Sequence, residues 1–279
     1  MLNDDTRTRA GGCTLFIALI IAAFALFNYF GSTQKNPVTG ETQHVSLTPT
    51  QEIQLGLQAA PQMEQEFGGL SKNERAQALV EKVGERIVER SDAQKTPYKY
   101  EFHVLADSST INAFSLPGGP VFITMALLNK LRTQGQLAGV LGHEIGHVVA
   151  RHGAEQLAQK QLTQGLVGAI GVASYDPNHP YSSQRTAALA AAIGQLINLK
   201  YSRKDELEAD KLGVKFMSEA GYDPRAMIEV MKVLEAVGQK QGRTPEFFST
   251  HPNPENRITR IKEDIQQLYP NGVPEGLQD

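Results

Sequence analysis

The most apolar part of the chain lies near its amino end. From Cys13 to Phe30 the residues are apolar, with Thr14 and Asn28 as the interruptions. As a helix this stretch would be about 27 Å long, close to the hydrocarbon thickness of a bilayer. The pattern predicts a transmembrane anchor over residues 1–32. A cleaved signal peptide and a buried soluble helix are the alternatives.

The charges that flank this stretch predict its orientation. Arg7 and Arg9 precede it, and Lys35 follows it. The positive-inside rule then places the amino end in the cytoplasm and the rest of the chain on the extracytoplasmic, periplasmic side. Residues 33–48 are polar and contain proline and glycine, so we expect a linker there.

Helical spacing of apolar residues dominates the remainder of the chain. A helix is predicted from Thr48, with Pro61 as a kink or break, and an amphipathic helix from Asn73 to Arg90, with Ser71 as its cap. Further helical patterns continue to residue 268. We expect one domain over residues 49–270, followed by a polar tail over 271–279.

Two segments have strand-like patterns instead. Residues 98–105 alternate between apolar and polar side chains, which predicts a strand. Residues 111–123 contain two short apolar runs around Pro117-Gly118-Gly119, which predicts a β-hairpin. The expected fold class is therefore α+β, mainly α, with a small β-sheet edge.

Composition narrows the classes of function. The chain has 279 residues, of which 41% are hydrophobic, enough for one sizeable core. The net charge is −3 without a run of Lys and Arg, so nothing indicates a nucleic-acid partner. The single cysteine, Cys13, excludes an internal disulfide framework.

A His-Glu-x-x-His motif gives the chain its candidate chemistry. His143 and His147 are four residues apart, so on a helix they share a face and can bind one metal ion. Glu144 can then take a proton from the attacking water. Thr133 and Gln136 predict a capping box at the start of this apolar helix, and Gly153 its end.

A third metal ligand has to come from another element. Glu206 and Asp210 are also four residues apart on a predicted helix, so two helices packed face to face would bring Glu206 to the histidines. The fourth position would stay open, as in catalytic zinc sites. Asp210, one turn further, would orient a ligand histidine. Spacing along the helices places His152 off the metal face and Glu208 toward solvent.

These motifs together resemble the HtpX-like and CAAX-prenyl-endopeptidase-like gluzincins, a family of zinc metallopeptidases. The motifs are His143-Glu144-x-x-His147, Ser202-Arg203-x-x-Glu206-x-x-x-Asp210, Asn112-Ala113-Phe114 with Pro117-Gly118-Gly119, and Thr250-His251-Pro252 with Arg257. The resemblance covers residues 50–268. It is to a single-span bacterial type, because this sequence has one apolar span where integral-membrane members have several.

The resemblance implies a role for each motif. His143, His147 and Glu206 would bind one zinc ion, and Glu144 would be the general base. Asn112, Ala113 and Phe114 would form an edge strand that pairs with peptide.

Asp210 and His251 are the remaining catalytic candidates. Family descriptions give Asp210 a proton-donor role, whereas its spacing favours orientation of a ligand. His251 is a candidate donor to the oxyanion, and a loop histidine packed on Pro252 is its structural alternative.

We therefore expect a membrane-anchored zinc endopeptidase that acts on polypeptides in protein quality control, on unfolded or misassembled substrates. The alternative is a zinc-stabilised chaperone or binding module with little or no proteolysis. The polar loop at 174–183 could cover the cleft, with His179 reaching the metal.

Overall fold

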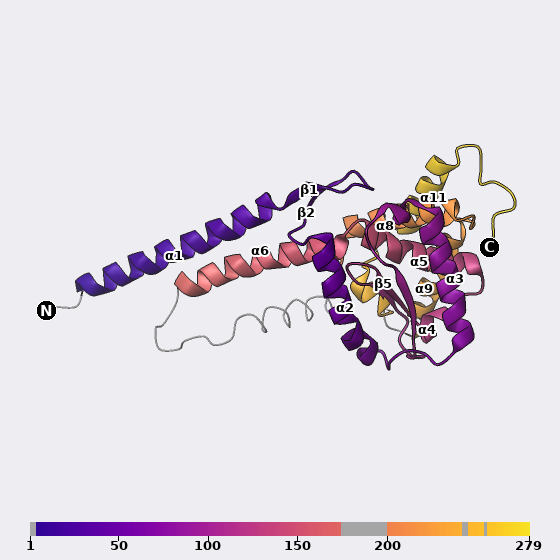
Figure 1. Cartoon of the computed structure of the whole chain (residues 1–279), viewed down its shortest axis with the longest axis horizontal. Helices are drawn as coiled ribbons and strands as arrows, with labels where there is room; N and C mark the ends of the chain where they lie inside the picture. Colours follow the sequence, from indigo (N-terminus) through magenta and orange to yellow (C-terminus); the bar gives the residue numbers. More distant parts are fainter. Residues whose placement is uncertain (1–3, 174–199, 242–244, 254–255) are drawn as a thin grey trace.

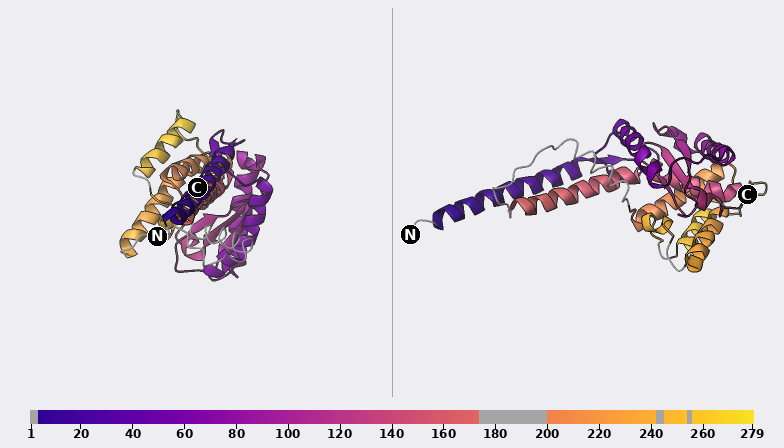
Figure 2. Two further views of the ribbon diagram at one scale, coloured as in Figure 1. Left: turned by 90° about the vertical axis from the view of Figure 1, so that its left-hand side faces the viewer. Right: turned by 90° about the horizontal axis from the view of Figure 1, so that it is seen from below.

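The computed structural model describes residues 4–173, 200–241, 245–253 and 256–279. A compact body is joined to a long arm of two helices (Figure 1). The arm consists of α1 (Asp4–Gly31) and α6 (His152–Ala173), which lie side by side in both orientations of the molecule (Figure 2). The loop expected at 174–183, with His179, and the helix expected at 187–199 lie outside the described residues.

Helix α1 exposes many large apolar side chains. Phe16, Leu19, Phe24, Phe27 and Phe30 are each more than half exposed. Within the portion of the chain whose side chains are described, which begins at residue 15, we find no helix with the length and apolar character needed to span a membrane.

The residues expected to form a linker have regular structure. Strands β1 (Thr33–Lys35) and β2 (Thr42–His44) pair as an antiparallel hairpin. Helix α2 (Pro49–Glu66) follows, and the Thr48 side chain caps it in a reciprocal capping box with Gln51. Pro61 was expected to kink or break this helix. It does not break it, because α2 continues through Pro61 to Glu66.

A three-stranded sheet forms the centre of the body. Its strands are β3 (Glu101–Leu105), β4 (Ala113–Ser115) and β5 (Pro120–Thr124), in the order β3-β5-β4. The predicted hairpin is confirmed as the antiparallel pair β4–β5, whereas β3 pairs with β5 in parallel. Within the described residues, β4 is therefore an edge strand of the sheet.

Helices cover both faces of this sheet, so every residue of β5 is buried. Alternate strand residues point to opposite faces. Val121 and Ile123 belong to the main core with residues of the helices over 74–90 and 134–149, whereas Phe122 packs in a second cluster with residues of α2. Helix α3 (Glu74–Arg90) has its apolar stripe buried as predicted, but its cap is Asn73 rather than Ser71, since the Asn73 side chain accepts the Ala76 N–H.

The motif helix α5 (Gln134–Val149) is buried along most of its length. Thr133 caps it by accepting the Gln136 N–H, but the Gln136 side chain accepts from Arg132, so the predicted capping box is only half formed. The helix ends before Gly153, the predicted end, because Arg151 adopts a left-handed conformation with φ 59° and α6 begins at His152.

Buried polar contacts fasten this junction between α5 and α6. Arg151 forms an ion pair with Glu52, which also accepts a hydrogen bond from Tyr98 at 2.9 Å. The Asn36 side chain of the β1–β2 hairpin donates to the Val149 carbonyl at 2.8 Å. The arm, the hairpin and the motif helix therefore meet at one point.

The remaining elements complete the body. They are the 3₁₀-helix η1 (Asp92–Lys95), α4 (Met125–Leu128), α8 (Arg203–Glu219), α9 (Ala226–Gln241), α10 (Phe247–Thr250) and α11 (Arg257–Leu268). Ser202 and Asp205 form a reciprocal capping box in the first turn of α8.

Glycines allow α5 and α8 to pack very closely. A Cβ atom at Gly146 would lie 2.9 Å from the Ala209 carbonyl oxygen, and one at Gly213 would lie 2.9 Å from the His143 nitrogen. Real Cβ atoms essentially never approach backbone so closely. The backbones of the two helices therefore approach to a distance that larger residues would prevent.

Candidate active site

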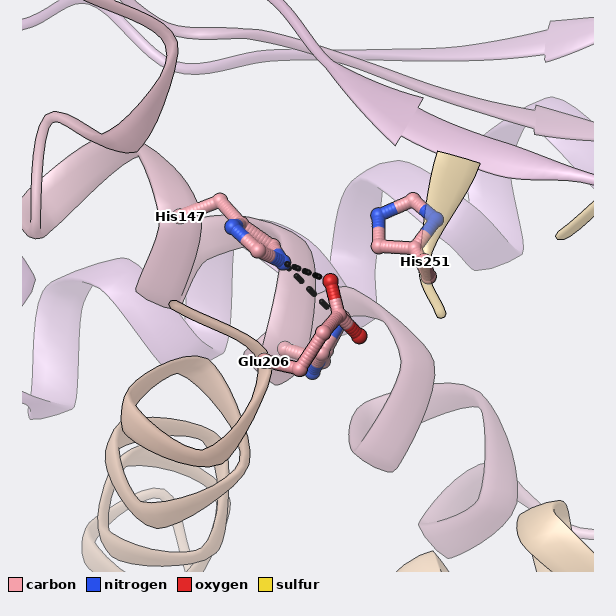
Figure 3. Close-up of side chains that lie close together, drawn as sticks. His147, Glu206 and His251 are labelled. Atoms are coloured by element: carbon pink, nitrogen blue, oxygen red, sulfur yellow. Dashed lines mark hydrogen bonds and ion pairs between the residues drawn. The ribbon is translucent and has the colours of Figure 1, made fainter. Parts of the chain in front are cut away.

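The close packing of α5 and α8 brings three side chains of the sequence motifs together. The Nε2 atoms of His143 and His147 lie 3.0 Å apart. The Glu206 carboxylate lies 3.4 Å from His147 Nε2 and 3.6 Å from His143 Nε2. Figure 3 shows Glu206 directed at His147 from the facing helix. Glu206 therefore lies beside the two histidines, the position that its i, i+4 spacing with Asp210 predicted.

These distances fit a common metal ion. Two ligand atoms each about 2.1 Å from an ion at tetrahedral angles lie about 3.4 Å from one another. In addition, both carboxylate oxygens of Glu206 are buried without a hydrogen-bond partner in the described residues. Arg257 Nη1 lies 3.2 Å from Oε2 as an ion pair, but buried carboxylate oxygens without hydrogen bonds are costly, and a bound cation would satisfy them further.

The protonation states also suit metal binding. Burial lowers the pKa of His147 well below its usual value, so the ring stays neutral and keeps a free lone pair. Burial raises the pKa of Glu206 well above its usual value, and the Arg257 charge opposes that effect. A bound cation would favour the charged carboxylate that ligation requires.

Glu144 lies beside this cluster and is completely buried. Burial raises the pKa of Glu144 to about 7, while the neighbouring His143 lowers it. Ser115, at the end of β4, donates a hydrogen bond from Oγ to Glu144 Oε2 at 3.1 Å. The other oxygen, Oε1, has no hydrogen-bond partner within the described chain. A general base is most effective when its pKa is near the working pH, which suits Glu144.

Asp210 lies behind the ligands, as its spacing predicted. The Nδ1 atom of His143 donates to Asp210 Oδ1 at 2.9 Å. Arg257 holds the same carboxylate, with Nε 2.7 Å from Oδ2 and Nη2 2.8 Å from Oδ1. Burial alone would raise the pKa of Asp210, but the Arg257 charge and the His143 hydrogen bond bring it to about 2. This geometry suits an orienting carboxylate, because Asp210 is ionised and already engaged.

His251 lies beside the candidate metal ligands. Its ligand atom lies within 4.8 Å of those of His143, His147 and Glu206. Its Nδ1 is 3.2 Å from the Phe247 carbonyl, and its ring stacks on Phe247, so its Nε2 faces the cluster. That atom is 3.4 Å from Glu144 Oε1 (Figure 3 shows the ring). His251 could therefore serve as a fourth ligand.

The strand expected to pair with substrate is shifted by one residue. Asn112 precedes β4, which runs from Ala113 to Ser115. A pocket of about 60 Å³ opens beside β4, lined by Phe114 and His251 together with Met63 of α2. Because β4 is an end strand of the sheet and carries Ser115 to Glu144, a peptide beside it would pass the candidate base.

Several contacts to the ligands were missed from the sequence. Tyr201 stacks on His147, with ring centroids 3.9 Å apart. His152 lies 2.9 Å from His147, Nδ1 to Nδ1, and Glu208 is half-buried beside His152 instead of facing solvent. His152 lies outside the cluster of candidate ligand atoms, in agreement with its spacing along the helix. It nevertheless contacts the candidate ligand His147, because the left-handed Arg151 interrupts the helix between them. No spacing rule reveals such a break.

A buried set of two histidines and a glutamate, with a second glutamate beside it and a sheet edge nearby, defines a class of protein. This is the arrangement of a metallopeptidase of the His-Glu-x-x-His type.

Comparison with known families agrees with this class. The model of Peptidase family M48 matches residues 74–265, and the chain belongs to that family. This match confirms the resemblance inferred from the motifs.

The named relatives are proteases, and two of the three are named metalloendopeptidases. The chain is 29% identical over 265 residues to the Beta-barrel assembly-enhancing protease of Escherichia coli, covering 91% of this chain and 53% of the relative. It is 32% identical over 237 residues to the Mitochondrial metalloendopeptidase OMA1 of Schizosaccharomyces pombe, covering 84% and 67%. For the human Metalloendopeptidase OMA1 the identity is 30%, covering 88% and 48%. The chain thus spans about half the length of the Escherichia coli and human relatives.

Proposed function

We propose that this protein is a zinc-dependent endopeptidase. The carrying observation is the set of three ligand atoms from α5 and α8 at mutual distances of 3.0 to 3.6 Å. Two imidazoles and one carboxylate form a donor set typical of catalytic zinc. Zinc would polarise the scissile carbonyl and bring the pKa of a water molecule down to about 7.

The chain's own residues supply the remaining chemistry. Glu144 accepts the proton of the attacking water through Oε1, since Ser115 holds Oε2. The same carboxyl then returns the proton to the departing amine. Asp210 keeps the His143 proton on Nδ1, so that Nε2 remains a ligand. Arg257 keeps Asp210 ionised and also lies 3.2 Å from Glu206.

Substrates of this site would be unfolded or misassembled polypeptides. Pairing of a peptide with the backbone of β4 would give affinity with little dependence on side chains. The apolar pocket beside β4 would favour a hydrophobic side chain near the cut bond. The Escherichia coli relative is named for enhancing β-barrel assembly, which agrees with a role in protein quality control.

We further propose that α1 anchors the protein in a membrane, with the body on the extracytoplasmic, periplasmic side. The apolar run from Cys13 to Phe30 is long enough for a bilayer, and the large exposed side chains of α1 are costly in water. On this proposal, residues 1–32 are the anchor, the β1–β2 hairpin connects it and residues 49–270 form the catalytic domain.

Digestion of an unfolded protein such as casein tests the enzymatic proposal. The unchanged chain should cleave casein, and a chelator should stop the cleavage until zinc is restored. The Glu144→Gln variant should retain zinc but lose cleavage by at least about 10²-fold, because the base is gone. Glu229→Gln, at an exposed position of α9, is the matched control and should cleave normally.

The same assay separates a peptidase from a binding module. A zinc-stabilised chaperone would bind unfolded casein without cutting it, in both the unchanged chain and the Glu144→Gln variant. Cleavage that persists in Glu144→Gln would show that another residue is the base.

A further inference from the structure

The two ligand histidines have different partners on their outer nitrogen atoms. His143 donates from Nδ1 to the carboxylate of Asp210, as described above. The Nδ1 of His147 instead meets a second imidazole, that of His152, at 2.9 Å. His152 is only 1% exposed, and it is the first residue of α6. The arm helix therefore begins with a residue in contact with a candidate metal ligand.

The metal site determines where the protons of this histidine pair lie. The Nε2 atom of His147 faces the cluster, 3.4 Å from Glu206. A ring that binds a cation through Nε2 carries its proton on Nδ1. This N–H donates to Nδ1 of His152, which must then present a lone pair.

His152 consequently holds its own proton on Nε2. That atom lies 3.5 Å from Oε2 of Glu208, which follows Glu206 by two residues on α8. His152 Nε2 is buried and has no hydrogen-bond partner among the described residues, so the Glu208 carboxylate at ion-pair distance is the acidic group that faces it. A carboxylate at this place favours the proton on Nε2, and so it favours the tautomer that His147 needs.

We propose that His152 is a positioning residue for the ligand His147 and that Glu208 fixes the tautomer of His152. Together with Tyr201, which stacks on the face of the His147 ring, His152 holds the ring by its edge. The inference rests on the metal site proposed above, and it assigns a role to two residues that spacing alone would place outside the site.

Zinc affinity tests this assignment directly, with the full chain and a competing chelator. The His152→Phe variant keeps the ring volume but removes the acceptor, so its zinc dissociation constant should rise by about 10- to 100-fold. His152→Asn places an amide oxygen near the position of Nδ1 and should recover most of the affinity. Glu208→Leu should weaken zinc binding less than His152→Phe does.

His103→Phe is the matched control, because this half-buried histidine on β3 stacks on Phe122 and not on a candidate ligand. Its zinc affinity should equal that of the unchanged chain. Circular dichroism monitors folding of each variant. If His152→Phe does not fold, Glu208→Leu is the variant to measure. An unchanged zinc dissociation constant in Glu208→Leu would overturn the proposed role of Glu208 and His152.

Three further results would overturn the proposal. The first is an unchanged dissociation constant for His152→Phe, and the second is an Asn variant as weak as the Phe variant. The third is an unchanged chain that does not bind zinc, which would reject the metal site itself. The first two results would reject the positioning role of His152 but leave the proposed peptidase intact. Failure of this inference can therefore be distinguished from failure of the proposed function.

Discussion

The position of His251 bears on whether the fourth coordination position of the proposed metal site is open or occupied. Its ligand atom lies within 4.8 Å of those of His143, His147 and Glu206. Four protein ligands are typical of structural metal sites, whereas a catalytic site keeps one position open. If His251 binds the ion as a fourth ligand, it holds the position that water and the substrate carbonyl need.

The direction in which replacement of His251 changes the cleavage rate therefore distinguishes its two possible roles. We expect His251→Ala to raise the rate of peptide cleavage at saturating zinc, because the fourth position opens, and to weaken zinc binding. Measurement of kcat and of zinc affinity checks both effects. A fall in kcat by about 10²–10³ would instead support the oxyanion role predicted from the sequence.

At the scale of residues, regular spacing was a reliable guide and irregular backbone was not. His143, His147 and Glu206 were predicted as a cluster because each pair of positions follows the helix repeat. The contact between His147 and His152 depends on the left-handed Arg151, and a non-glycine residue in that conformation leaves no signal in the sequence.

At the scale of elements, the junction of α5 and α6 depends on a buried ion pair. Glu52 of α2 is 1% exposed and Arg151 is 7% exposed. Arg151 also donates to the Leu47 carbonyl and the Gln34 side chain, so three segments share this one cation. Removing one partner of a buried pair leaves the other charge uncompensated.

The Glu52→Gln variant should accordingly lose about 3–5 kcal/mol of unfolding free energy. Urea denaturation of the variant and the unchanged chain measures the difference. Glu263→Gln is the control, since Glu263 pairs with Arg260 on an exposed surface and should change stability by less than about 0.5 kcal/mol. Equal losses in both variants would contradict the special role of the junction.

Elements with long apolar periodicity were predicted well, and short ones were not. The stripe of α3 and the hairpin around Pro117-Gly118-Gly119 were confirmed, because each repeats a pattern or contains specific turn residues. The β1–β2 hairpin has strands of three residues, too short for an alternation to be recognised. The parallel pairing of β3 with β5 depends on tertiary packing, which no local pattern contains.

At the scale of the whole molecule, zinc should stabilise the body, because its proposed ligands come from two helices distant in sequence. Free zinc at 100 times its Kd contributes about 2.7 kcal/mol to the folded state. For a domain of this size, that corresponds to a rise in Tm of about 5–10 °C. Thermal unfolding with and without chelator measures the shift. Glu206→Gln should abolish most of it, and a full shift in that variant would point to other ligands.

The arm provides the second test at this scale. The full chain should float with lipid vesicles, whereas the double variant Phe24→Asp and Phe27→Asp should stay largely in the dense fraction, because charges oppose insertion. The double variant Leu57→Asp and Leu70→Asp changes two exposed apolar residues of the body and should float normally. Equal flotation of both variants would contradict an anchor in α1.

The glycines between α5 and α8 have a consequence for any attempt to stabilise this protein. Alanine is a better helix former than glycine by about 1 kcal/mol. At Gly146 and Gly213, however, the added methyl group would meet backbone at 2.9 Å and wedge apart the two halves of the site. Local helix strength and metal-site geometry therefore oppose each other here, and a screen that ranks substitutions by helix propensity would select the changes most harmful to the enzyme.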